Sequence, residues 1–119
     1  MQFISCTHKQ AYQRLNGDAY PKHIKEALYV IAYLPERIQK SISWDLQDPQ
    51  NAWMDFSYFS IRVSKGEQIL LQLANDLYNG TGNFDIAFAD MYCDTACKQL
   101  IANALFMHFD QSNAIYTSI

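Results

Sequence analysis

Apolar residues recur every three or four positions along much of the chain, which is the spacing of one face of an α-helix. The pattern is strongest over residues 65–78 and 95–109, and each stretch follows a residue that caps helix N-termini. Ser64 and Glu67 match a capping box, in which the serine oxygen accepts from the third amide and the glutamate reaches back. Asn79-Gly80 ends the first stretch. These two segments are therefore predicted to be the best-formed helices.

Three further helices are predicted in the first third of the chain, each beginning after a serine or a proline. Ser5 precedes a helix from Cys6 to about Leu15, and Pro21 is expected to open a helix that runs to about Tyr33. Pro35 ends that helix and opens a short third one. The residues expected on the inner helix faces are Ala11, Tyr12, Leu15, Ile24, Ala27, Leu28, Ile31, Ala32, Ile38, Ile42, Ile69, Leu70, Leu73, Ala74, Leu77, Cys97, Leu100, Ile101, Ala104, Leu105 and His108.

Residues 43–63 show no helical periodicity. Asp48-Pro49 resembles a cap followed by a first helical turn, and residues 58–63 alternate apolar with polar positions as a strand does. A lone strand cannot satisfy its own backbone groups, so this segment is either an extended loop over the helices or an edge that needs a partner. The predicted fold is all-α: one domain, 1–119, a compact bundle of about five helices with an irregular or short extended segment near residues 56–63.

The composition supports a folded, water-soluble chain. Half of the 119 residues are hydrophobic, and 8 Tyr, 7 Phe and 2 Trp exceed what disordered chains carry. No stretch reaches the roughly 18 consecutive apolar residues of a membrane span. The N-terminus lacks the basic and apolar regions of a signal peptide, so a cytoplasmic location is expected. Some of the Tyr excess is expected at the surface, where the hydroxyl stays hydrated.

Charge is distributed unevenly along the chain. Residues 1–40 hold six basic and three acidic residues, whereas residues 41–119 hold three basic and nine acidic ones, which gives +3 against −6 and the overall −3. Such a split can create one acidic face, although many of the Asp residues also suit helix caps and turns. Because the pI is about 5.4 and the basic residues are scattered, direct nucleic-acid binding is not expected.

The cysteines and histidines suggest two chemical hypotheses, and the sequence favours neither. Cys93, Cys97 and His108, with Cys6 and His8, could supply zinc ligands, but the Cys-x-x-x-Cys spacing is a weak signal and Cys93 need not face Cys97. We therefore predict that no metal or other cofactor is bound. A Cys6 nucleophile with a histidine base lacks any supporting motif, and His8 is better explained as completing the Ser5 cap.

An aromatic segment lies in the least regular part of the chain and contains Trp44, Trp53, Phe56, Tyr58 and Phe59. These residues are either core or a partner surface, since Trp and Tyr are enriched at binding hot spots. Combined with the acidic C-terminal portion, they suggest a protein–protein contact surface. The candidate residues are Trp53, Asp55, Tyr58, Asp76, Asp85 and Asp90, with Asp76 expected to be exposed.

Several short motifs resemble a family of uncharacterised small proteins from bacterial phages and mobile elements, the DUF6075-like group. They are Phe3-Ile4-Ser5-x-x-His8 with Tyr12, Ala27-Leu28-Tyr29, Trp53, Ser64, Leu73-Ala74-x-x-Leu77-Tyr78-Asn79-Gly80 and Ala104-Leu105. The resemblance implies a cytoplasmic accessory or anti-defence factor and supplies no catalytic residues.

Together these features predict a non-catalytic protein-binding module, and specifically a phage or mobile-element inhibitor of a bacterial defence enzyme, similar in role to an anti-CRISPR protein. Its expected partner is a protein, such as a basic nucleic-acid-processing enzyme. Two alternatives remain. One is a small cytoplasmic homo-oligomeric structural protein, such as a homodimer, and the other is a small Cys-dependent enzyme.

Overall fold

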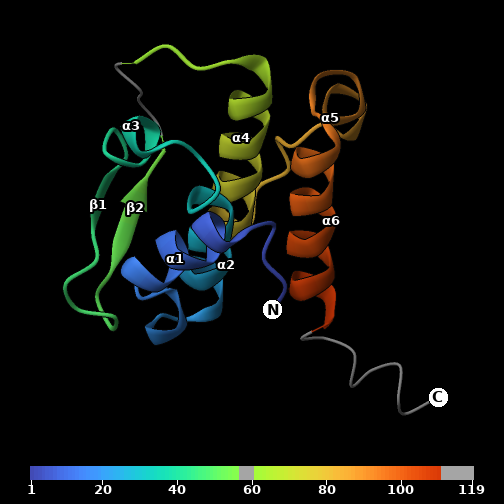
Figure 1. Ribbon diagram of the computed structural model, residues 1–119. Coiled ribbons are helices and arrows are strands. Elements are labelled where there is room, and N and C mark those ends of the chain that lie inside the picture. Colours follow the sequence, from blue (N-terminus) through green and yellow to red (C-terminus); the bar gives the residue numbers. More distant parts are fainter. Residues whose placement is uncertain (57–60, 111–119) are drawn as a thin grey trace.

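Six α-helices, one 3-10 turn and one two-stranded hairpin make up residues 1–56 and 61–110, which are the residues that the computed structural model describes (Figure 1). The protein is therefore mostly helical. In chain order the elements are α1 (Cys6–Arg14), η1 (Gly17–Ala19), α2 (Lys22–Ile31), α3 (Glu36–Gln39), β1 (Ser43–Asp45), β2 (Trp53–Asp55), α4 (Lys65–Asn79), α5 (Ile86–Tyr92) and α6 (Thr95–Asp110).

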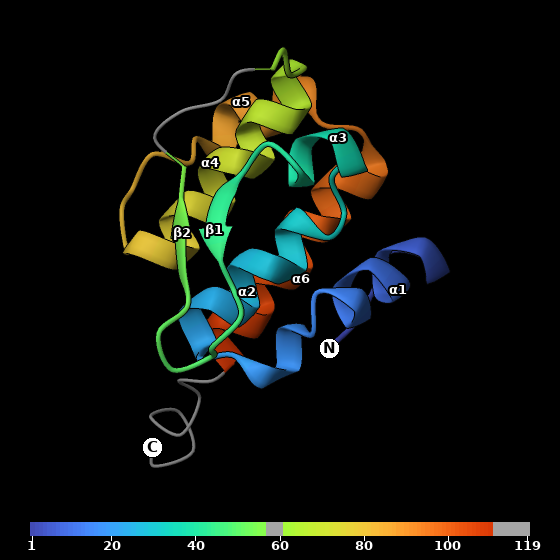
Figure 2. The same ribbon diagram turned by 90° about the vertical axis from the view of Figure 1, so that its left-hand side faces the viewer.

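Helix α2 forms the centre of the structure. From Ala27 to Ile31 every residue is buried, and the helix packs against α4, α6 and η1. Figure 2 shows α2 between the hairpin on the near side and α6 behind it. A helix that is apolar on all sides belongs in a core. The surrounding elements are arranged to cover it.

The hairpin corrects the all-α prediction. β1 and β2 pair antiparallel, with Trp44 opposite Met54, so each strand supplies the partner that the other needs. Asp48 does not start a helix. Its carboxylate accepts from the Gln50 amide at 3.0 Å and from the Asn51 side chain at 2.7 Å, which builds the turn between the strands. Asp followed by Pro suits a turn as well as a helix start, and the sequence alone did not separate the two.

The predicted extended segment is displaced along the chain. The strands lie at residues 43–45 and 53–55, whereas residues 61–63 carry no strand. Residues 57–60, which include Tyr58 and Phe59, lie outside the described residues. Phe56 contacts the Tyr78 ring at a centroid distance of 6.1 Å, and Met54 N–H donates to the Tyr78 hydroxyl at 3.1 Å. The hairpin is thereby attached to the end of α4.

Two tyrosines are buried in the core, and Tyr12 was predicted on the inner face of its helix. Tyr12 donates its hydroxyl hydrogen to Asp18 at 2.8 Å, and Tyr29 donates to the Gln2 carbonyl at 2.5 Å. Both hydroxyls are therefore satisfied although the rings are buried. Gly17 allows this packing, because a Cβ at that position would lie 2.1 Å from the Tyr12 ring.

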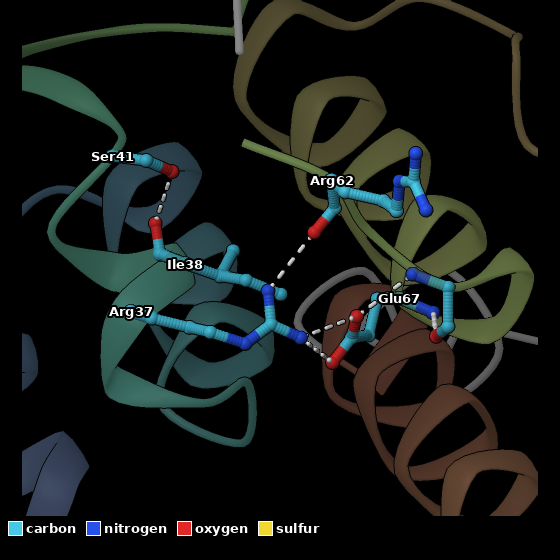
Figure 3. Close-up of polar contacts among 6 residues, drawn as sticks. Arg37, Ile38, Ser41, Arg62 and Glu67 are labelled. Carbon is cyan, nitrogen blue, oxygen red and sulfur yellow. Dashed lines mark hydrogen bonds and ion pairs between the residues drawn. The ribbon is translucent and has the colours of Figure 1, made fainter. Parts of the chain in front are cut away.

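The capping box predicted at the start of α4 is confirmed. Glu67 N–H donates to Ser64 Oγ at 3.1 Å, and Ser64 N–H donates to Glu67 Oε1 at 2.8 Å. Figure 3 shows a third partner from α3: the Arg37 guanidinium donates to both Glu67 carboxylate oxygens at 3.0 Å and to the Arg62 carbonyl at 3.0 Å. One carboxylate thus caps α4 and joins it to α3. At the other end Gly80 adopts a left-handed φ of 69°, as the predicted helix end requires.

Removing the Ser64 cap should weaken the fold. Ser64→Ala should lower the free energy of unfolding by about 1 kcal/mol, because the Glu67 amide loses its acceptor. Urea unfolding followed by circular dichroism measures this. Ser64→Thr is the matched control, since it keeps a side-chain oxygen at the cap and should retain most of the stability. Equal midpoints for the wild type and Ser64→Ala would show that the cap contributes nothing.

The contact between Arg37 and Glu67 should appear as a coupling energy. In a double-mutant cycle with Arg37→Met and Glu67→Gln, we expect about 0.5 to 1 kcal/mol, because Arg37 is largely exposed and water screens the pair. Gln at position 67 can still complete the capping box, so the cycle isolates the charge contact.

The same coupling should depend on pH. Burial acts to raise the pKa of Glu67, but the hydrogen bonds from Ser64 and Arg37 together lower it below the ordinary 4.5. The carboxylate therefore stabilises the fold above pH 4.5, and that stabilisation is lost as the pH falls through the folded-state pKa. A coupling that stayed constant down to the acid-unfolding range would contradict this assignment.

Candidate functional site

The predicted residues of the middle segment lie on the hairpin. Trp53 and Asp55 belong to β2, and the Trp53 side chain is 45% exposed. Trp44 and Phe56 are half-buried and pack against the core. The aromatic segment is thus divided between core and surface, and Trp53 is the residue that it presents to solvent. Tyr58 lies outside the described residues.

Asp76 has a structural role that the sequence did not reveal. Its carboxylate accepts from the Thr81 hydroxyl at 2.6 Å and from the backbone amides of Asn83 and Phe84 at 3.0 and 2.6 Å. Asp76 was predicted to be exposed, but the residue is partly buried. Asp76 therefore holds the loop between α4 and α5 in place.

Asp85 and Asp90 lie on α5 and are both exposed. Asp85 caps this helix by accepting from the amides of Ala87 and Phe88 at 2.8 and 3.2 Å. This is one of the capping roles that the sequence suggests for the Asp residues, and the helix runs to Tyr92. Asp90 forms an ion pair with Lys98 of α6 at 3.1 Å.

The structure does not bring the predicted residues together into one surface. Figures 1 and 2 both place the hairpin and α5 on opposite sides of α4. The strand that carries Trp53 and Asp55 is therefore separated by α4 from the helix that follows Asp85 and carries Asp90. The hairpin and α5 are close in the sequence, but α4 lies between them in the structure. They therefore do not share one face.

Helix α5 instead presents an apolar surface that sequence reasoning missed. Ile86, Phe88 and Met91 are 74, 51 and 67% exposed, and Ala89 is the residue of this helix that is buried. We call these three side chains, with Asp85 and Asp90, the α5 surface. In the sequence, the apolar residues of positions 86–92 are equally compatible with a buried helix. The tertiary structure shows that no described residue covers the three exposed side chains.

The inner side of α5 is held against the start of α4. Lys65 Nζ lies 4.4 Å from the centre of the Tyr92 ring and donates to its hydroxyl at 3.1 Å. A Cβ at Gly66 would lie 3.5 Å from the Tyr92 carbonyl, so the two backbones are close. These contacts fix the orientation of α5 and keep its apolar side outward.

Cys93 and Cys97 face each other, in contrast to the expectation that they need not. Their Sγ atoms lie 2.6 Å apart and both side chains are buried. Burial raises the pKa of the Cys97 thiol, and the neighbouring Cys93 adds to this. Cys97 is therefore held as a neutral thiol, which has to lose its proton before it can react.

The other hypothetical zinc ligands are engaged elsewhere. Cys6 is exposed at the start of α1, and His108 Nδ1 lies 2.7 Å from Glu26 Oε1. Within residues 1–56 and 61–110 no three His, Cys, Asp or Glu side chains converge as a metal site would require. The absence of zinc stays a prediction.

His8 is not placed to serve as a base for Cys6. Its Nδ1 accepts from the Ile4 amide at 3.1 Å, so the proton resides on Nε2, which donates to the Tyr29 carbonyl at 2.8 Å. Both ring nitrogens are therefore occupied. Ser5 Oγ accepts from the His8 backbone amide at 3.1 Å, so Ser5 caps α1, but the His8 side chain does not complete this cap as predicted and contacts Ile4 and Tyr29 instead.

A groove of about 660 Å³ lies between the N-terminus and α6. Its lining includes Met1, Tyr29, Asn103, Phe106 and Met107. This lining is mainly apolar and amide in character and holds no nucleophile beside a base. The groove therefore does not suggest an active site.

No helix in the described part of the chain combines the length and apolarity that crossing a membrane requires. The longest, α6, has 16 residues. The cytoplasmic location stays a prediction.

The buried neutral His8 should make stability depend on pH. Burial lowers the pKa of His8 below the ordinary 6.5, although the hydrogen bond to the Tyr29 carbonyl partly opposes this. Below pH 6.5 the unfolded chain therefore binds a proton that the folded chain does not, so the free energy of unfolding falls as the pH falls. His8→Gln should remove this contribution, because Gln does not titrate.

Urea unfolding of wild type, His8→Gln and the exposed-site control His23→Gln, at several pH values from 7.5 to about 5, measures the effect. The difference between wild type and His8→Gln should change across this range, and that between wild type and His23→Gln should change less. Parallel curves for wild type and His8→Gln would contradict the assignment of His8 as neutral.

Comparisons of this chain with protein-family models, with curated proteins and with solved structures found no match. The resemblance to the DUF6075-like group was not tested by them and stays a prediction. The assignment of a function therefore depends on the geometry of the molecule.

Proposed function

We propose that this protein is a non-catalytic protein-binding module and that the α5 surface is its contact site. The observation that carries the proposal is the exposure of three large apolar side chains, Ile86, Phe88 and Met91, on one short helix. Large apolar side chains grouped on a surface with polar neighbours are typical of protein–protein contact sites.

The energetics favour a contact of this kind. Burying an Ile, Phe or Met side chain gains about 1.5 to 3 kcal/mol relative to leaving it in water. Three such residues on a helix that its contacts with α4 already orient form a preorganised contact, and little ordering entropy has to be lost on binding. A few central apolar anchors commonly carry most of the energy of an interface.

The charges around α5 indicate the chemistry of the partner. Between Lys65 and Lys98 the chain contains five acidic residues and no basic one. Asp85 and Asp90 flank the apolar side chains directly, and the ion pair of Asp90 with Lys98 is exposed to water. The matching surface is an apolar groove with a basic rim on another protein.

This chemistry is compatible with the predicted basic nucleic-acid-processing partner and with an inhibitor of a bacterial defence enzyme, and both stay predictions. A homodimer through α5 is less favoured. A twofold contact would bring Asp85 and Asp90 close to the same residues of the second copy, where like charges repel.

Polar substitution of the apolar side chains tests the proposal. Ile86→Ser combined with Met91→Ser should weaken binding to a captured partner at least about tenfold, since each side chain at the centre of a contact contributes more than about 1 kcal/mol. Phe106→Ser on α6 is the matched control, because Phe106 is also exposed, at 72%, but lies on another helix. Circular dichroism should show that all variants are folded.

The measurement is quantitative capture from bacterial lysate with nuclease present, followed by titration of the captured protein at two salt concentrations. Retention by wild type and Phe106→Ser, with loss on the double variant and weaker binding at high salt, supports the α5 surface. Equal retention by the double variant places the contact elsewhere.

Light scattering across protein concentrations tests the homodimer. A homodimer through α5 predicts a mass twice that of the monomer only while Ile86 and Met91 are present.

A further inference from the structure

The junction between α5 and α6 brings two cysteines to one point. Cys93 ends α5 in an extended conformation, and Cys97 lies in the first turn of α6. Asp94 caps that turn by accepting from the Cys97 amide at 2.8 Å. Because of this turn the two Sγ atoms lie 2.6 Å apart, within roughly 0.6 Å of the length of a disulfide bond.

The pair is buried but lies beside an opening. A pocket of about 340 Å³ is lined by both cysteines together with Tyr33, Lys65 and Asp94. A small molecule can thus approach the sulfur atoms from one side. Cys6, by contrast, is exposed on α1 and has no cysteine partner within the described residues.

We infer that Cys93 and Cys97 are a reversible oxidation site that reacts with low-molecular-weight disulfides such as oxidised glutathione. One thiol loses its proton and attacks a sulfur of the small disulfide, which forms a mixed disulfide and releases one thiolate. The second thiol then loses its proton and attacks the protein sulfur, which releases the second thiolate. The protein is oxidised by two electrons, and the small disulfide is reduced to two thiols.

The two sulfur atoms lie close enough for either to attack the small disulfide first and for the other to resolve the mixed disulfide. Because a thiol must be deprotonated to react, the exchange should accelerate as the pH rises.

This site is independent of the α5 surface. Ile86, Phe88 and Met91 project to solvent, whereas Cys93 and Cys97 face the interior between α5, α6 and α4. The oxidation can therefore be tested whatever the partner of the protein is.

Intact-mass spectrometry after incubation of the full chain with oxidised glutathione tests the inference. Wild type and the control Cys6→Ser should each lose the mass of two hydrogens without a stable glutathione adduct at positions 93 or 97. Peptide mapping should place the bond between Cys93 and Cys97. Cys93→Ser and Cys97→Ser should not form it, and each of these variants should accumulate glutathione on the cysteine that remains of the pair.

A second measurement uses only the wild-type chain and so does not depend on the folding of the variants. The equilibrium constant for oxidation against a glutathione buffer should be at least about tenfold larger in the native protein than in concentrated urea, because the fold holds the sulfurs together. Equal constants in the two conditions would overturn the inference. So would a native protein in which Cys6 alone reacts while Cys93 and Cys97 remain reduced.

Discussion

The burial of the C-terminal half of α2 on all of its sides is the constraint on which the rest of the structure depends. Its run of apolar residues from Ala27 to Ile31 has no face that tolerates water, so every neighbouring element must cover part of it. α4 and α6 pack along its length, and His8 of α1 closes over its C-terminal half by donating to the Tyr29 carbonyl. The arrangement of the other elements around α2 follows from the need to exclude water from these apolar residues.

A charged side chain also lies in this core. Glu26 lies on α2 and is fully buried, with His108 at 2.7 Å and Lys22 at 4.0 Å. A buried carboxylate is costly unless it has partners, so Glu26 requires the last turns of α6 to dock where His108 can reach it. This contact joins residues that are 82 positions apart and determines how α6 lies across α2. The groove beside the N-terminus lies along the same docked helix.

The two features with functional potential both arise at α5, and for the same reason. This helix is too short to bury more than Ala89 against the core, so its large apolar side chains remain outside. Its last residue must also turn the chain directly into α6, and this turn brings Cys93 onto Cys97. The tight connection between α5 and α6 thus accompanies two features. The contact surface is directed outward, and the oxidisable cysteine pair is directed inward.

The sequence by itself determined the helices with caps and one apolar stripe. Ser5, Ser64, Asp85 and Asp94 each act within a few residues of their own position, so local chemistry was sufficient to place the helix starts that they cap. The hairpin, the role of Asp76, the exposure of α5 and the meeting of Cys93 with Cys97 were decided by the tertiary structure. Strand pairing depends on contacts between distant residues. The identity of an apolar residue does not by itself show whether other elements will cover it. The separation of Trp53 from Asp90 has the same origin, because the position of α4 between them is a property of packing around α2 and not of any local pattern.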